Sequence, residues 1–163
     1  MRGAAKRQFR DALEAMAIPA PFSLESFCEV VGDQRGKPVF VRAVPCRAPG
    51  WLGAWVSSPE AEYIYHAAGL AGLRRDHAVL HHVGHMLLGH RARSVASLAS
   101  LIAPGVSPRL VALLFGEDGG ADAGAPYADE EEAAAEAIAS LVLAAASRTP
   151  VAAWPAACWV VTE

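Results

Sequence analysis

Apolar residues in the first part of the chain recur at helical spacing and are interrupted by residues that end helices. In residues 4–17 the apolar positions lie on one helical face, with charged residues between them, and this pattern predicts an amphipathic helix. Pro19 ends that helix, because proline cannot continue the hydrogen-bond ladder. Ser23 is a suitable N-cap for a second helix over LESFCEVV, and Gly32 is its expected end.

Three short runs rich in β-branched and aromatic residues follow. They are PVFVRAV from Pro38, WLGAWV from Trp51 and AEYIYH from Ala61. Proline, glycine and serine residues between the runs mark turns. Each run is therefore predicted to form a strand, and we expect the three strands to form a small antiparallel sheet.

From Leu73 onward the apolar period becomes helical. RRDHAVLHHVGHMLLGH is predicted to form a helix of roughly four turns, buried on most sides. Further helices are predicted over SVASLASLIA, SPRLVALLF and DEEEAAAEAIASLVLAAAS. Residues 116–128 are expected to form a flexible loop, and residues 148–163 a tail. These elements predict one α+β domain over residues 1–163, in which the sheet packs against a helical bundle.

The composition favours a folded domain and argues against several classes of partner. The 163 residues are 53% hydrophobic and 19% charged, which is not the composition of a disordered chain. A formal net charge of -3 argues against direct nucleic-acid binding, which usually needs a basic excess. The most apolar run, AIASLVLAAA, is about half a membrane span. Three cysteines without a CxxC pair fit a reducing compartment. We therefore expect a cytoplasmic protein that does not bind membranes.

Two histidines four residues apart carry the most specific chemical signal. On a helix, His81 and His85 share one face with their bases roughly 6 Å apart, so both imidazoles can reach one metal ion at about 2.0–2.1 Å. His77 lies on the same stripe but about 12 Å from His85 along the axis, and is expected to support the site from outside or to lie at the surface. The pattern predicts a metal site, for zinc or another divalent transition metal.

The segment LHHVGHMLLGH resembles the core helix of the ImmA/IrrE-like metallopeptidase family, whose usual form is close to LHELGHLLLGH. A weaker likeness extends over residues 18–147. The resemblance implies a zincin-like fold, with a small antiparallel sheet beside the metal helix and a later helix that supplies a third ligand. It also implies a protein partner of the helix-turn-helix repressor class, which some members cleave or antagonise.

Carried onto this chain, the resemblance makes His81 and His85 the two histidine ligands. His82 stands where the family has its glutamate, the general base of the peptidase reaction. A neutral imidazole can accept a proton, but it carries no negative charge, and its pKa falls close to a metal ion. His82 is therefore either a catalytic base or a residue that fills the space of a lost catalytic group.

The third ligand of the family is a glutamate in a segment like ExEAE before an apolar-Ala pair. If Ile138 and Ala139 are that pair, the ligand position here is Ala134. Glu136, in the interior of the last helix, is the best substitute. Glu130–Glu132 are interpreted instead as acids favoured by the helix N-terminus.

Two further residues are candidates for substrate binding. Trp51 and Trp55 alternate around Gly53, so both are expected to face the same side of their strand. Such a pair either belongs to the core or, at a strand edge beside the metal helix, makes Trp55 part of a groove for an extended peptide. His66 ends the third strand and could point toward the cleft.

Three functions are compatible with these residues. The double departure at His82 and Ala134 favours a non-catalytic regulatory module that binds a protein and retains the fold, with or without a metal. The second is an active zinc metallopeptidase that cleaves a repressor-type partner. The third is a metal enzyme of different chemistry that uses the histidine cluster.

Overall fold

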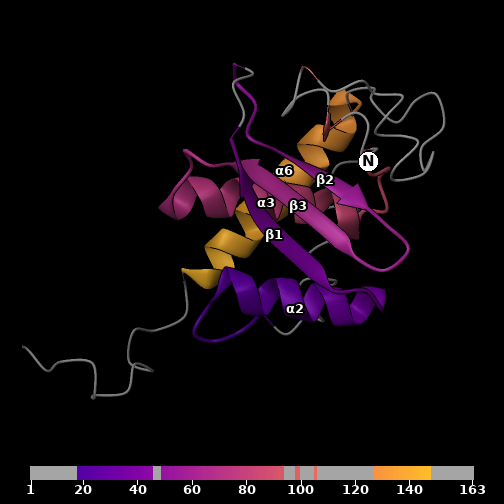
Figure 1. The fold of residues 1–163 in the computed structure, drawn as a ribbon. Helices are drawn as coiled ribbons and strands as arrows, with labels where there is room; N and C mark the ends of the chain where they lie inside the picture. The colour runs from indigo at the N-terminus through magenta and orange to yellow at the C-terminus, as the bar shows by residue number, and fades with distance from the viewer. Residues whose placement is uncertain (1–17, 46–48, 94–97, 100–104, 106–126, 148–163) are drawn as a thin grey trace, which may run out of the picture.

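The computed structural model describes residues 18–45, 49–93, 98–99, 105 and 127–147. Its elements are α2 (Leu24–Arg35), β1 (Val39–Val44), β2 (Gly53–Ser57), β3 (Glu62–Ala67), α3 (Gly72–Leu87) and α6 (Asp129–Ala146). The α+β class is confirmed: in Figure 1, α3 and α6 lie behind the sheet and α2 runs beside β1. No helix within the described ranges combines the length and apolarity needed to cross a membrane.

Several predicted elements lie outside the described residues. They are the helix over residues 4–17, the segments SVASLASLIA and SPRLVALLF apart from a few positions, most of the loop over residues 116–128, and the tail over residues 148–163.

The sheet is mixed, so the expectation of an antiparallel sheet is wrong for one of its two pairings. The strand order is β1-β3-β2. β2 and β3 pair antiparallel, whereas β1 and β3 pair parallel, with Val39 opposite Glu62. The tight turn between β2 and β3 dictates a hairpin, but the connection from β1 is long enough for β2 to pass to the far side. β3 therefore lies between strands that run in opposite directions.

Helix α2 begins as predicted and ends later than predicted. The Ser23 side chain accepts a hydrogen bond from the Ser26 amide at 3.2 Å, as an N-cap does. The helix continues past Gly32 to Gly36, which adopts the left-handed conformation with φ of 68°. Gly32 serves close packing instead, because a Cβ there would lie 2.9 Å from the Lys37 carbonyl oxygen.

The core lies between the helices and one face of the sheet. Its buried members come from α2, β2, β3, α3 and α6: Leu24, Phe27, Cys28, Val31, Trp55, Ile64, Val79, Leu80, Val83, Met86, Ile138, Ala139 and Val142. The opposite face of the sheet carries a smaller cluster that contains Ala54, Val56 and Leu98. The strands thus show the alternation of faces that a period of two produces.

A buried carboxylate links four elements through a network of hydrogen bonds. Glu62, at the start of β3, is fully enclosed. Its oxygens accept hydrogen bonds from the Trp55 indole N–H on β2 at 2.8 Å and from Arg35 on α2 at 2.8 and 3.2 Å. Arg35 also donates to the Met86 carbonyl of α3 at 2.9 Å. Burial alone would raise the pKa of Glu62, but these hydrogen bonds outweigh burial and lower it.

Helices α3 and α6 approach each other closely at a glycine. A Cβ at Gly84 would lie 2.7 Å from the carbonyl oxygen of Ala135 and 2.9 Å from its Cα. Real side chains do not tolerate such distances, so only glycine permits this separation of the two helices. The contact sets the distance between the histidines of α3 and the glutamates of α6.

Candidate metal centre

Helix α3 presents its histidines as the sequence predicts. His81 and His85 lie one turn apart in an unbroken helix, with their ring centroids 4.8 Å apart. The His85 side chain is fully enclosed, and that of His81 is 19% exposed. Polar rings in such a place need partners, and α6 supplies them.

Three ligand atoms from α3 and α6 converge on one point. The Nε2 atoms of His81 and His85 lie 3.1 Å apart. One carboxylate oxygen of Glu132, Oε2, lies 3.1 Å from His81 Nε2 and 3.9 Å from His85 Nε2. Among the described residues these three side chains form the one group with the spacing to hold a metal ion.

The donor set and its spacing fit a tetrahedral ion. With zinc–ligand bonds of about 2.0–2.1 Å, neighbouring donors of a tetrahedral site lie roughly 3.3 Å apart. Two of the three separations are 3.1 Å, and the third is 3.9 Å. Two imidazoles and one carboxylate leave a fourth position open, as in catalytic zinc sites. Glu132 is 45% exposed, so the cluster is accessible from solvent.

The third member of the group is not the glutamate expected from the sequence. Glu136 Oε1 lies 2.8 Å from His77 Nε2, and its Oε2 lies 3.4 Å from Nδ1 of His81, on the side away from the cluster. Glu132 occupies the ligand position instead. Ala134 lies about 200° around the helix from Glu132 at 100° per residue, so the register taken from the family motif does not apply to α6.

Both histidines of the group have a partner on the outer ring nitrogen. Nδ1 of His85 lies 2.8 Å from Nδ1 of His90. Nδ1 of His81 faces Glu136, which His77 holds in turn. Outer partners of this kind fix the orientation and the tautomer of a metal-ligating imidazole. They leave the two Nε2 atoms to face Glu132.

Tyr127 covers one face of the His85 ring, a contact that the sequence pattern does not specify. Its ring stacks on His85 with the centroids 3.7 Å apart, and its hydroxyl donates to the Arg91 carbonyl at 2.9 Å. Burial raises the pKa of Tyr127 to about 12. No local pattern signals this contact, because Tyr127 precedes α6 and lies far from α3 along the chain.

His82, the candidate catalytic base, points away from the group and toward the sheet. Its Nε2 lies where a side chain at Gly53 would be, 2.7 Å from an ideal Cβ. Its Nδ1 is buried and has no hydrogen-bond partner among the described residues. Burial, with smaller effects from His81 and His85, lowers the pKa of His82 to about 3. His82 is therefore a neutral ring enclosed between α3 and β2.

The two candidates for substrate binding have other surroundings. Trp55 is buried in the main core, and its indole N–H bonds to Glu62, so it offers no surface to a substrate. Trp51 packs instead against the second cluster on the other face of the sheet. The two tryptophans do not share a face, because β2 begins only at Gly53. His66 is buried at the end of β3, and its Nδ1 lies 3.0 Å from the Ala67 carbonyl oxygen.

Comparison of the chain with protein-family models, curated proteins and solved structures found no match. A function is therefore inferred from the geometry of the cluster and its surroundings.

Proposed function

We propose that this chain is a zinc-binding regulatory protein, a degenerate form of the ImmA/IrrE-like metallopeptidases with a zincin-like domain. The convergence of His81 Nε2, His85 Nε2 and Glu132 Oε2 carries the proposal. Two helices and a close glycine contact hold these atoms within bonding distance of one centre. The short motif of α3 supports the family, and a helix-turn-helix repressor remains the partner that this resemblance implies.

The donor set favours zinc among the common metals. Imidazole and carboxylate ligands in a tetrahedral arrangement suit zinc, whereas magnesium and calcium prefer six or more oxygens. A bound zinc ion would supply a Lewis acid at the open position. Cys28 is outside the cluster, and burial raises the pKa of its thiol to about 12, so this thiol is not a competing ligand.

The position of His82 supports a binding role rather than peptidase chemistry. A general base must reach the proton that it removes, within about 3 Å or through one water molecule. His82 is enclosed beside Gly53, and its lowered pKa makes it a weak base. No other described carboxylate or imidazole takes the place of the family's glutamate, because Glu136 and His90 face the outer nitrogens of the ligands.

Zinc competition with a chromophoric chelator tests the metal site. We expect one zinc ion per chain and at least a tenfold loss of affinity in Glu132→Gln, because one of three ligands is weakened. Glu130→Gln, an exposed acid on the same helix, is the matched control. No stoichiometric binding, or equal affinities for the two variants, would remove the proposal.

Incubation of the zinc-loaded chain with casein tests the non-catalytic role. We expect no cleavage by the natural chain. Cleavage that is lost in His82→Ala but retained in Glu130→Gln would instead assign a peptidase activity that depends on His82.

A further inference from the structure

We propose that the groove between α2 and β1 binds an extended peptide segment of a partner protein. The segment adds to the sheet as a new strand beside β1 and places a lysine or arginine side chain next to Glu29 and Asp33. This peptide site is separate from the candidate metal site.

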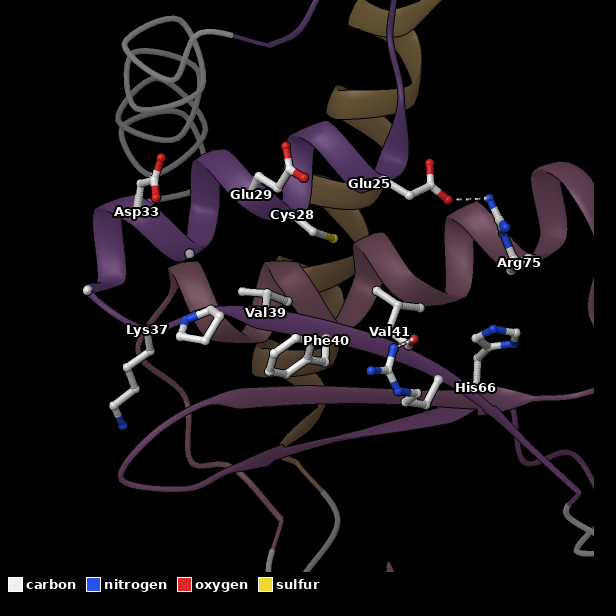
Figure 2. A pocket seen from close by; sticks show the side chains of 14 residues that line it. Glu25, Cys28, Glu29, Asp33, Lys37, Val39, Phe40, Val41, His66 and Arg75 are labelled. Carbon is white, nitrogen blue, oxygen red and sulfur yellow. Dashed lines mark hydrogen bonds and ion pairs between the residues drawn. The ribbon is translucent and has the colours of Figure 1, made fainter.

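The groove is an open hollow with one wall from a helix and one from a strand. Its volume is about 770 Å³. Figure 2 shows α2 above it with Cys28 directed inward, Val39 and Val41 of β1 below, and His66 at one end. A helix and an edge strand that face each other across a hollow can hold one extended chain between them. None of the metal-site ligands lines it.

The floor of the groove is the edge of β1, where backbone N–H and C=O groups can form hydrogen bonds with a peptide. β1 is an edge strand of the sheet, and among the described residues it pairs only with β3. The carbonyls of Pro38 and Val44 accept hydrogen bonds from the β3 side, so the even-numbered residues face β3. By alternation, the N–H and C=O groups of Val39, Val41 and Ala43 point away from β3. Gly32 of α2 packs against the Val39 nitrogen, because a Cβ at Gly32 would lie 3.3 Å from it. Val41 and Ala43 are therefore the residues that offer backbone groups to a peptide. Two outward residues that alternate along the strand can pair with a peptide of about four residues.

One exposed side chain occupies part of this edge in the free chain. The Arg42 guanidinium donates to the Val41 carbonyl at 3.0 Å. This contact is short-range and exposed, and such contacts are weak. An incoming peptide N–H replaces it at little cost. His66, expected from the sequence to contact a substrate, lies at the end of this groove and not at the metal cluster.

The charges around the groove select a basic segment. Glu25, Glu29 and Asp33 follow one another at four-residue spacing and form an acidic stripe on α2. Glu25 pairs with Arg75 at 3.5 Å. The carboxylates of Glu29 and Asp33 have no ionic or hydrogen-bond partner in the described part of the chain. Lys37, the nearest basic residue along the chain after Arg35, donates instead to the Ser58 carbonyl. Lys37, Arg42 and Arg75 also line the groove, but each of them has a partner within the chain. The Glu29 and Asp33 carboxylates therefore favour a lysine or arginine side chain on the α2 side of the groove.

Fluorescence anisotropy of fluorescein-labelled eight-residue peptides measures their binding to the full chain, in the presence of EDTA. We expect a peptide of alternating threonine and lysine to bind, and its threonine–glutamate counterpart not to bind. Two further peptides carry N-methyl groups on alternate backbone nitrogens, one on the threonines and one on the lysines. Only one of these should lose binding, because only one set of N–H groups faces β1.

The charge variant is Glu29→Gln with Asp33→Asn, both on the exposed side of α2. We expect it to weaken the basic peptide about fivefold, as two exposed ion pairs allow. The matched control is Asp129→Asn with Glu130→Gln on α6, which should leave the affinity unchanged.

Three results would overturn the proposal. The acidic peptide could bind as tightly as the basic one, or both methylated peptides could bind like the parent. Alternatively, sedimentation could show dimers that exclude the peptide, in which case a second copy of the chain occupies the groove. Because EDTA is present throughout, these outcomes are independent of zinc binding.

Discussion

His85 is enclosed on every side by groups with a defined role. Its Nε2 faces His81 and Glu132, its Nδ1 faces His90, and Tyr127 covers one face of its ring. Burial lowers the pKa of His85 to about 3, with smaller contributions from His81 and His90. The ring is therefore neutral, which is the form that binds a metal ion.

Replacement of His90 tests how this orientation is maintained. We expect His90→Leu to weaken zinc binding by about 10- to 100-fold, the usual effect of removing the outer partner of a metal-ligating histidine. His90→Asn should retain most of the affinity, because its side-chain oxygen can accept the same hydrogen bond from His85 Nδ1. Competition with a chromophoric chelator measures both variants. If the two have equal affinities, His90 contributes only packing.

At this scale the sequence predicted the two histidines of the candidate metal site but not its glutamate on α6. Two histidines of one helix keep their relation whatever surrounds them, so spacing alone located His81 and His85. Glu132 and Glu136 are also one turn apart, and the choice between them depends on how α6 is rotated against α3. The packing of Ala135 on Gly84 sets that rotation. Such a contact between two helices cannot be predicted from the spacing of residues within one helix.

At the scale of elements, the metal centre depends on the distance between α3 and α6. Neither helix carries the whole group: α3 supplies two imidazoles and α6 the carboxylate. Gly84 lies between His81 and His85 in the sequence and directly beneath the backbone of Ala135. Gly84, which permits the close packing, thus lies between the two histidines that could hold the ion.

The variant Gly84→Ala should therefore affect stability and zinc binding together. The added methyl group has no space, so α6 must shift, and overpacking of this kind costs about 1–3 kcal/mol. We expect urea denaturation to show that loss, and zinc affinity to fall because Glu132 moves with α6. Gly69→Ala is the control, since a Cβ there meets nothing within 4 Å. Reduced stability with unchanged zinc affinity would show that the group tolerates the shift.

The elements themselves were largely predictable, and their pairing was less so. The strands and the helices α3 and α6 lie where period and turn residues place them. The end of α2 was misplaced because Gly32 reads as a helix stop, although it serves close packing against Lys37. The parallel pairing of β1 with β3 could not be predicted, because strand order depends on the path of a connection that carries no periodic signal.

At the scale of the whole molecule, the Glu62 carboxylate is a shared anchor for α2, β2, β3 and, through Arg35, α3. A buried charge of this kind is stable only while its hydrogen bonds are complete. Together with the contact of α3 with α6 at Gly84, this anchor links α2, α3, α6, β2 and β3.

The stability of the domain should depend on pH through Glu62. Its lowered pKa means that its contribution is fully present above the ordinary value of 4.5 and is lost as pH falls through the folded-state pKa. We expect Glu62→Gln to lower the free energy of unfolding by about 2 kcal/mol at pH 7. The difference from the natural chain should shrink below pH 4.5. Urea denaturation at several pH values measures it, with Glu29→Gln as the control. A difference independent of pH would show that shape, and not charge, matters at position 62.

Gly53 and His82 form one packing contact between β2 and α3. The absent side chain at Gly53 is the room that the imidazole of His82 fills. A substitution at either position would thus be limited by the residue at the other. A glutamate at position 82 would enter a space beside β2 that the imidazole ring now fills. A larger residue at position 53 would clash with that ring. Neither change alone fits the space that the two residues share, so we expect positions 53 and 82 to vary together.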